Sequence, residues 1–322
     1  MTTTPPSTPS PSCTRRQFLQ SGGLGLLSLI WSDRAGAQTQ APNPLQALRD
    51  ADRIDGPPIV SARAWAIAEG RTGRFLWGAN ESAELVMAST TKIMTAHLVL
   101  REAATHCGVL DEVMVISARA AQTTGSSAQI RAGDRFTVGE LLYGLLLPSG
   151  NDAAAAMAEH FGPRLAQGQE RHSVPPLEVF VNQMNRQAAA FRLAETHYFD
   201  PHGLGRNHTS ARDLTKLAWH AMQDSVFRGY VRTRRHQYEV TDAHGMRRTV
   251  TWNNTNRLLD IEGYDGIKTG TTTAAGSCLV ASGRHGADHL YVAVLGCTSN
   301  DSRYVDTRNL FRWARRERGH RS

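Results

Sequence analysis

The sequence predicts an α+β fold, with one antiparallel sheet built from both chain ends and flanked by helices. Two groups of observations lead to this prediction. Strand-like runs lie near residue 60 and again after residue 260, and the later turns are rich in glycine. Between them, residues 88 to about 225 follow a helical period, so we expect an inserted all-helical subdomain.

The composition is that of an ordinary globular protein. Apolar residues make up 40% and charged residues 20% of the 322 residues, which excludes wholesale disorder and collagen-like repeats. The four cysteines form no Cys-x-x-Cys pair, so neither a disulfide framework nor a zinc site is expected. The formal charge of +7 is modest and favours a solvated basic surface over a nucleic-acid interface.

Residues 1–37 have the order of an export signal. Arg15 and Arg16 are followed by x-Phe-Leu and then by the apolar stretch Gly22–Trp31, and a small-x-small cleavage site ends at Ala37. Ten apolar residues span about 15 Å as a helix, half of a hydrocarbon core of about 30 Å. We therefore predict a cleaved signal of the twin-arginine type rather than a membrane anchor, and a protein exported to the periplasm or outside the cell.

The remaining chain divides into a linker, residues 38–57, and a catalytic domain, residues 58–322. An opening hairpin is expected over Val60–Ala68 and Arg74–Gly78. Capping boxes at Thr137 and Ser210 predict two helix starts inside the helical block. The chain is expected to close with three antiparallel strands and an amphipathic helix: Gly266–Gly270, Ser277–Arg284, His289–Leu295 and Ser302–Arg316.

Three cysteines follow the predicted signal, at positions 107, 278 and 297. An oxidising compartment permits disulfides. The expected hairpin register separates Cys278 from Cys297 by several residues, however. We therefore expect all three, including Cys107, to be small buried apolar residues.

Lysine is rare in this chain. Of the 36 basic residues, 33 are arginine and only Lys92, Lys216 and Lys268 are lysine. Arginine stays protonated in proteins, whereas a buried lysine can lose its proton and act as a base. A lysine in a chemically suggestive sequence is therefore a candidate functional residue. Lys216 lies inside a predicted helix away from any motif and is expected to be solvated.

The first such sequence is Ser89-Thr90-Thr91-Lys92, which opens an apolar helix. Residues three apart share a helix face, so Lys92 is expected to stand beside Ser89. A serine hydroxyl is a poor nucleophile without an adjacent base, and a desolvated lysine amine can be that base. The helix N-terminus adds a positive field that favours an oxyanion near Ser89.

Two further motifs follow. Lys268-Thr269-Gly270 opens a late strand, and three lysines, 28 threonines and 28 glycines give a chance expectation of roughly 0.02 for it. Such an edge can pair with an extended peptide, with Gly270 letting the substrate backbone approach and Thr269 offering a hydroxyl to a carboxylate. Ser149 and Asn151 flank Gly150 in what would alone be a common turn sequence.

Together the three motifs resemble, in order and spacing, the penicilloyl-serine group of penicillin-binding proteins and serine β-lactamases. Within that β-lactamase/transpeptidase-like superfamily the closest likeness is to low-molecular-mass, serine-type D-alanyl-D-alanine carboxypeptidases. The resemblance covers roughly residues 58–313. Longer stretches also carry it: Thr124–Ser127, Leu141–Ala154, Phe180–Leu204 and Asp265–Gly276.

The resemblance implies roles for four catalytic residues. Ser89 would be the acylated nucleophile, and Lys92 the base that takes its proton. Ser149 would relay a proton to the nitrogen of the leaving D-alanine. Asn151 would hold the substrate backbone and contact Lys92.

It also implies a set of substrate-binding residues. Lys268 would sustain a positive field, and Thr269, at the edge that Gly270 opens, would bind the terminal carboxylate. The backbone N–H of Thr271, with that of the nucleophile, would form the oxyanion hole. Arg303 resembles the family arginine that pairs with the substrate carboxylate, a bidentate task that suits a guanidinium. No metal or cofactor is implied.

Two departures from related proteins narrow the prediction. Family members that dock on the membrane carry an extra β-rich domain and an amphipathic tail, whereas 52 residues follow Gly270 (322 − 270), so membrane anchoring is not expected. Class A β-lactamases use a Glu-x-x-Leu-Asn loop to activate water. Glu170, Glu178 and Glu195 do not lie in that pattern, so fast β-lactam hydrolysis is not expected.

The sequence therefore predicts a penicillin-sensitive DD-carboxypeptidase that removes the terminal D-alanine from peptidoglycan stem peptides through an acyl-Ser89 intermediate. Its expected partners are stem peptides ending in D-Ala-D-Ala, with β-lactams as covalent inhibitors. Three alternatives remain: a DD-endopeptidase that cleaves peptidoglycan cross-links, an esterase on the same scaffold, and a non-catalytic β-lactam or wall-binding sensor.

Overall fold

The computed structural model describes residues 56–242 and 244–319. The predicted signal, residues 1–37, and nearly all of the predicted linker lie outside the described residues. Within the described ranges, no helix is both long and apolar enough to cross a bilayer.

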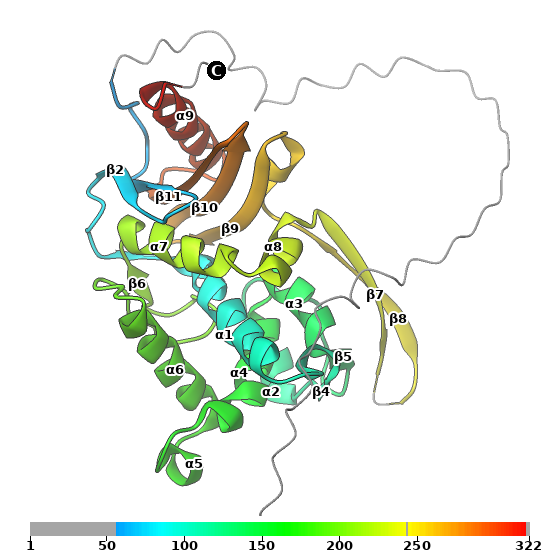
Figure 1. Cartoon of the computed structure of the whole chain (residues 1–322). Helices are drawn as coiled ribbons and strands as arrows, with labels where there is room; N and C mark the ends of the chain where they lie inside the picture. Colours follow the sequence, from blue (N-terminus) through cyan, green and yellow to red (C-terminus); the bar gives the residue numbers. More distant parts are fainter. Residues whose placement is uncertain (1–55, 243, 320–322) are drawn as a thin grey trace, which may run out of the picture. The chain divides into compact units, whose positions relative to one another are not determined.

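The centre of the fold is a five-stranded antiparallel sheet in the order β2-β1-β11-β10-β9 (Figure 1). As predicted, its strands come from both ends of the described chain. Ala64 pairs with Leu295, and Val280 pairs with Lys268. The strands of this sheet are β1 (Ala64–Glu69), β2 (Phe75–Ala79), β9 (Tyr264–Thr272), β10 (Gly276–His285) and β11 (Asp288–Cys297).

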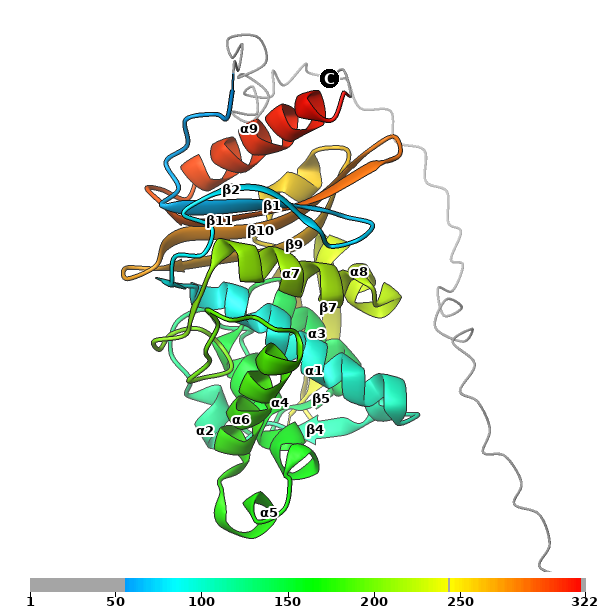
Figure 2. The same ribbon diagram turned by 60° about the vertical axis from the view of Figure 1, so that its left-hand side comes forward.

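Helices cover both faces of this sheet. Helix α9 (Ser302–Glu317) lies on one face and α7 (Ala211–Met222) on the other (Figure 2). Strands β1, β10 and β11 are therefore buried almost throughout, which explains their nearly continuous apolar runs. The predicted late strands and final helix are confirmed, each with bounds shifted by a few residues.

The residues between β2 and β9 contain most of the helices. The predicted caps are present, because Thr137 Oγ1 accepts a hydrogen bond from the Glu140 N–H and Ser210 Oγ accepts one from the Asp213 N–H. The helical elements here, besides α7, are η1 (Ala88–Thr91), α1 (Lys92–Thr105), η2 (Val109–Asp111), α2 (Ala118–Ala121), α3 (Val138–Leu146), α4 (Asn151–Leu165), α5 (Glu170–Ser173), α6 (Pro176–Ala190), α8 (Ser225–Arg232) and η3 (Arg257–Asp260).

The prediction of an all-helical subdomain needs correction. Two small antiparallel sheets accompany the helices, one in the order β4-β5-β7-β8 and one that pairs β3 with β6. Four of these strands have only two or three residues, too few for a period of two to stand out from a helical pattern. The strands are β3 (Leu85–Val86), β4 (Val113–Val115), β5 (Arg135–Thr137), β6 (His208–Thr209), β7 (Arg235–Thr241) and β8 (Arg247–Asn253).

The cysteine predictions are confirmed in part. Cys278 and Cys297 are buried, but Cys107 is exposed because it follows the end of α1. The expected register was wrong as well. Cys297 lies opposite Ser277 after an irregularity in the β10–β11 pairing, so it is one position from Cys278 rather than several. The irregularity lies beside Gly296, which has a φ of 69°, and a glycine inside a strand pattern can mark such a bulge.

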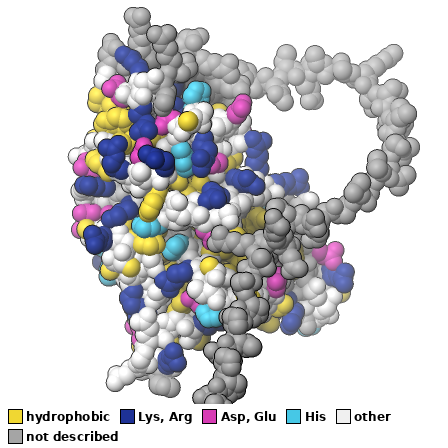
Figure 3. Space-filling view, in the orientation of Figure 1, with side chains coloured by type: hydrophobic (Ala, Val, Ile, Leu, Met, Phe, Trp, Pro, Cys, Tyr) yellow, Lys and Arg dark blue, Asp and Glu magenta, His cyan; other side chains and the backbone are white. Residues whose placement is uncertain are grey.

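Basic side chains are spread over the surface. Figure 3 shows Lys and Arg side chains across much of one face, with acidic and polar side chains between them. Lys216 is partly exposed and donates a hydrogen bond to the backbone oxygen of Arg192, which fits the expectation of a solvated helix residue.

Candidate active site

Ser89 lies on the 3₁₀ turn η1, directly before α1. The preceding residue, Ala88, has a φ of 48°, a left-handed conformation that is unfavourable for a residue with a Cβ. Neighbours hold it there. Thr91 Oγ1 donates to the Ala88 oxygen at 2.8 Å, and a Cβ on Gly203 would lie only 2.0 Å from that oxygen. The nucleophile candidate is thus presented by a tightly packed turn.

Lys92 is completely buried at the start of α1. Its Nζ lies 3.0 Å from Ser89 Oγ, 2.6 Å from Asn151 Oδ1 and 2.7 Å from the backbone oxygen of His202. Burial lowers the pKa of Lys92 to about 7, although the negative charges of Asp200 and Asp152 act in the opposite direction. Near neutral pH, a large share of the protein therefore carries a neutral amine at this position.

These three contacts fix what the neutral amine of Lys92 can do. It has two hydrogens and one lone pair. The Asn151 Oδ1 and the His202 carbonyl oxygen can only accept hydrogen bonds, so both hydrogens are directed to them. The lone pair is left for the hydroxyl hydrogen of Ser89. This is the arrangement that a general base needs within hydrogen-bond reach of its nucleophile.

Asn151 is oriented by its second contact. Its Nδ2 donates to the backbone oxygen of Thr124 at 2.8 Å, which directs Oδ1 towards Lys92. The next residue, Asp152, accepts hydrogen bonds from Ser127 Oγ at 2.6 Å and from the Ala128 N–H at 2.9 Å. The start of α4 is therefore fastened to residues 124–128, and Asn151 has little freedom to move.

Ser149 precedes α4 and has a φ of 69°. Only 5% of the residue is exposed, and its Oγ makes no hydrogen bond to any described residue. A buried hydroxyl without a partner costs about 1–3 kcal/mol. This hydroxyl is therefore available to bind a group of the substrate.

Strand β9 contributes the second buried lysine. Lys268 is 1% exposed, and its Nζ donates to the backbone oxygen of Thr269 at 3.2 Å. Burial, together with the positive charges of Lys92 and Arg303, holds the pKa of Lys268 well below its ordinary value. The neighbouring Thr269 shares a hydrogen bond of 2.7 Å with the hydroxyl of Thr255.

Gly270 meets a steric requirement within the protein itself. A Cβ at this position would lie 2.9 Å from the Ser89 nitrogen and 3.0 Å from the Met87 oxygen. The glycine therefore lets strand β9 pack directly on the backbone of Met87 and Ser89, at the start of the 3₁₀ turn η1. The approach of a substrate backbone to the same glycine stays a prediction.

Arg303, the second residue of α9, reaches the same end of β9. Its Nη1 donates to Thr271 Oγ1 at 2.9 Å and to the Gly270 oxygen at 3.3 Å, and its Nη2 donates to the Tyr304 hydroxyl at 3.3 Å. The side chain is 7% exposed, and its Nε has no hydrogen-bond partner among the described residues. The guanidinium thus holds strand β9 and still has donor capacity for an anion.

The motifs predicted from the sequence therefore meet around Ser89. Three contributors were missed: Asp152, Asp200 and the backbone oxygen of His202. All three lie in stretches that carry the family resemblance. A backbone carbonyl has no side-chain signal, however, and the contact between Lys92 and His202 joins residues 110 positions apart.

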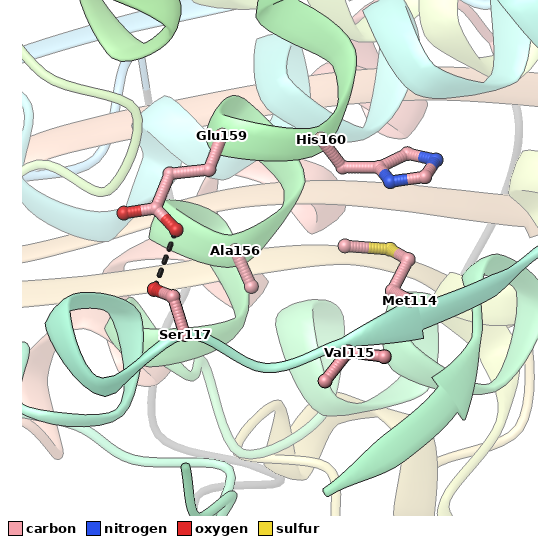
Figure 4. A pocket seen from close by; sticks show the side chains of 6 residues that line it. All are labelled: Met114, Val115, Ser117, Ala156, Glu159 and His160. Carbon is pink, nitrogen blue, oxygen red and sulfur yellow. Dashed lines mark hydrogen bonds between the residues drawn. The ribbon is translucent and has the colours of Figure 1, made fainter. Parts of the chain in front are cut away.

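A separate cavity lies away from these residues. Its volume is about 180 Å³, and it lies between β4 and α4, where Ser117 donates a hydrogen bond to Glu159 (Figure 4). None of the predicted site residues lines it. The described part of the chain also contains no group of three or more His, Cys, Asp or Glu that could hold a metal ion.

Comparison with known proteins decides the family. The model of peptidase family S11, described as D-alanyl-D-alanine carboxypeptidase, matches residues 52–299. The chain belongs to this family. It is 35% identical over 271 residues to a D-alanyl-D-alanine carboxypeptidase of Streptomyces sp. (strain K15), covering 82% of this chain and 90% of the relative. It is 32% identical over 272 residues to DacD of Escherichia coli (strain K12), covering 80% and 64%.

Solved structures agree with the family. The structure titled as the Streptomyces K15 DD-transpeptidase matches with a TM-score of 0.73 and 33% identity, covering 80% of this chain and 98% of that one. The D-alanyl-D-alanine carboxypeptidase DacD from Francisella tularensis matches with a TM-score of 0.70 and 28% identity, covering 83% and 74%. The predicted α+β fold and the predicted enzyme class, a serine-type D-Ala-D-Ala carboxypeptidase, are confirmed.

Proposed function

We propose that this carboxypeptidase removes the terminal D-alanine from peptidoglycan stem peptides with Ser89 as nucleophile and Lys92 as base. One observation carries the assignment of roles. Lys92 is completely buried, and two of its three Nζ contacts are to groups that can only accept, so its lone pair faces Ser89 Oγ.

In the proposed acylation, Ser89 Oγ attacks the carbonyl carbon of the D-Ala-D-Ala bond while Lys92 takes the hydroxyl proton. The backbone N–H groups of Ser89 and Thr271 stabilise the oxyanion. The proton passes from Lys92, through the hydroxyl of Ser149, to the nitrogen of the leaving D-alanine as the C–N bond breaks. Water then hydrolyses the acyl-Ser89 ester and restores the free hydroxyl.

Substrate binding is assigned to the other predicted residues. Asn151 holds the substrate backbone, and strand β9 from Lys268 to Thr271 lies alongside it. Thr269 and Arg303 bind the terminal carboxylate. Burial and the neighbouring positive charges hold the pKa of Lys268 well below its ordinary value, so an arriving carboxylate would stabilise the charged form of this lysine.

The sequence of residues 1–37 supports export of the protein by the twin-arginine route. The joint change Arg15→Lys with Arg16→Lys is expected to leave unprocessed precursor inside the cell, because the paired arginines are the recognised feature. Terminal sequencing of the exported wild-type protein should begin at Gln38. Normal export of the variant would point to the general secretory route.

The decisive experiment offers two substrates to the purified protein. Release of free D-alanine from a pentapeptide supports the proposed function, and cleavage of a cross-linked muropeptide supports the DD-endopeptidase alternative. Turnover of neither, with penicillin still binding, supports a sensor. An amine acceptor in the same mixture reports whether the acyl group passes to water or to the amine.

A covalent label tests the nucleophile. Penicillin should add its mass to the peptide that contains Ser89, and Ser89→Ala should abolish labelling. An adduct mapped by mass spectrometry to another residue would refute the assignment of Ser89.

A further inference from the structure

The loop of residues 200–207 brings the His202 carbonyl to Lys92, and Asp200 organises this loop. Its Oδ1 accepts the His202 N–H at 2.8 Å and lies 2.9 Å from the His202 Nδ1, and its Oδ2 accepts the Gly205 N–H at 2.6 Å. The Asp200 side chain is only 14% exposed. One carboxylate therefore closes the tight turn on which the His202 carbonyl depends.

The same loop is tied to the segment that carries the nucleophile. Thr95 Oγ1, one turn after Lys92 on α1, donates to the Pro201 oxygen at 2.6 Å. Asn207 Nδ2 donates to Thr91 Oγ1 at 3.0 Å and to the Asp200 backbone oxygen at 2.9 Å. These contacts leave the loop little room to move relative to Lys92, so the turn that Asp200 closes sets the position of the His202 oxygen.

Asp200 also acts on Lys92 through its charge. The titratable groups that act on Lys92 are Asp152 from α4, Lys268 from β9 and Asp200 from the loop, and the His202 imidazole lies against Asp200. Burial raises the pKa of the Asp200 carboxyl, but the His202 side chain and the loop N–H groups lower it more, well below its ordinary range. Asp200 is therefore an anion at every pH where the enzyme is expected to work.

We propose that Asp200 is a positioning residue for the reaction: it holds the His202 carbonyl against the amine of Lys92 and keeps a negative charge close to that amine. The proposal rests on the acylation of Ser89 assigned above, and it adds a residue outside the three motifs. The carboxylate has to be both present and correctly placed, and these two requirements can be separated by mutation.

The test is the pH profile of acylation by a labelled penicillin, measured as a second-order rate constant from pH 5 to 9. Asp200→Asn removes the charge, and its amide nitrogen cannot accept the Gly205 N–H. Loss of a nearby negative charge makes the ammonium form of Lys92 less stable. The acidic limb of the profile, where the rate constant rises with pH, should therefore shift to lower pH by about one unit. The limiting rate should fall by about tenfold because the amine is less well aligned.

Two matched variants separate charge from position. Asp200→Glu keeps the charge and displaces the carboxylate, so its limiting rate should fall while the acidic limb stays at the wild-type pH. Asp242→Asn changes another turn carboxylate, which accepts the N–H groups of His244 and Met246 at the tip of the β7–β8 hairpin. It should change neither quantity.

If Asp200→Asn does not fold, Asp200→Ser also removes the charge, and its hydroxyl can still accept the His202 N–H. A limb that stays in place in both charge-removing variants overturns the proposal and leaves Asp200 a purely structural residue. A wild-type protein that penicillin does not acylate overturns the proposed function instead, so the two failures are distinct.

Discussion

The surroundings of the two buried lysines differ more than their burial does. Lys92 and Lys268 are both shielded from solvent, yet Lys92 Nζ has three oxygen contacts and two nearby carboxylates. Lys268 Nζ has one backbone contact, at 3.2 Å, and faces the positive charges of Lys92 and Arg303. The two sites therefore suit different tasks.

In the proposed mechanism, this difference lets one residue type provide both a general base and a positive electrostatic field. Around Lys92 the two acceptor oxygens are held in place, so the lone pair of the amine is directed at Ser89 Oγ. This arrangement favours transfer of the hydroxyl proton from Ser89 to Lys92. Around Lys268, burial and the nearby cationic groups lower the pKa, so an entering anion would stabilise the charged form. The predictions that follow test this division, beginning with the largest expected effect.

The same substitution at the two lysines should give unequal results. Lys92→Arg keeps a positive charge but removes the base, since arginine is not deprotonated in proteins. A general base contributes about 10²–10⁴-fold in rate, and acylation by labelled penicillin should fall by that amount. Lys268→Arg should have a milder effect, because charge is its assigned contribution.

The control for this pair is the folded state of each variant, followed by circular dichroism and thermal melting. Lys92→Arg acylating at the wild-type rate would remove Lys92 from the role of base. If both variants fold well and lose the same fraction of the acylation rate, the assignment of a base to Lys92 and of a charge to Lys268 would be wrong.

Loss of Arg303 should affect recognition of a free carboxylate. A hydrogen bond to a charged group contributes about 1.5–3 kcal/mol, so Arg303→Ala should lower kcat/KM for a D-Ala-D-Ala peptide by roughly 10–100-fold. The same peptide capped as a C-terminal amide has no charge for the guanidinium to meet. Its slow hydrolysis should hardly change.

The amide substrate also controls for structural damage, because Arg303 donates hydrogen bonds to Gly270 and Thr271. A disturbed β9 would slow both substrates alike. Equal losses on both, or no loss on either, would exclude Arg303 from carboxylate binding.

Gly270→Ala tests whether β9 packs on the nucleophile turn. The added Cβ would lie 2.9 Å from the Ser89 nitrogen, so strand and turn must separate. Overpacking of this kind costs about 1–3 kcal/mol of unfolding free energy, and acylation should slow as Ser89 moves. Urea denaturation and penicillin labelling measure the two effects.

Gly229→Ala is the matched control. This glycine lies in α8, and a Cβ there would meet nothing within 4 Å. Alanine in a helix is more stable than glycine by about 0.5–1 kcal/mol, so this variant should gain slightly in stability and acylate normally. An unchanged stability in Gly270→Ala would contradict the close packing of β9 on the turn.

Proton uptake on binding tests the account of Lys268. Burial and nearby positive charges hold the pKa of Lys268 well below its ordinary value in the empty site, so the arrival of a carboxylate should raise that pKa, and any proton taken up comes from the buffer. Calorimetry of a D-Ala-D-Ala peptide binding to the non-reacting Ser89→Ala variant, in buffers of different ionisation enthalpy, measures the uptake. Adding Lys268→Arg should abolish it, since arginine is already charged.

Local spacing predicted a good part of this site. Ser89 and Lys92 are three residues apart, and that separation alone predicts their contact when the segment is helical. The strand that carries Lys268 and the capped starts of α3 and α7 were likewise predicted, because capping residues and turn glycines act over a few positions.

Contacts between residues far apart in the sequence could not be predicted from the residues alone. The contact of Lys92 with the His202 oxygen depends on how a loop folds back, and a backbone oxygen is present at every position. The packing of η1 against Gly270 could not be predicted either, because the sequence does not show which backbone approaches a glycine. The short strands β4 and β5 were missed because three residues do not establish a period.

The central claim is that the buried amine of Lys92 takes the proton of Ser89, and its most direct test is the pH dependence of acylation. A base must be unprotonated, so the rate constant should rise with pH and level off through a pKa of about 7. Lys92→Arg should remove this rise along with most of the rate. A wild-type profile that is flat from pH 5 to 9, or a rise through pH 7 that persists in Lys92→Arg, would contradict the account.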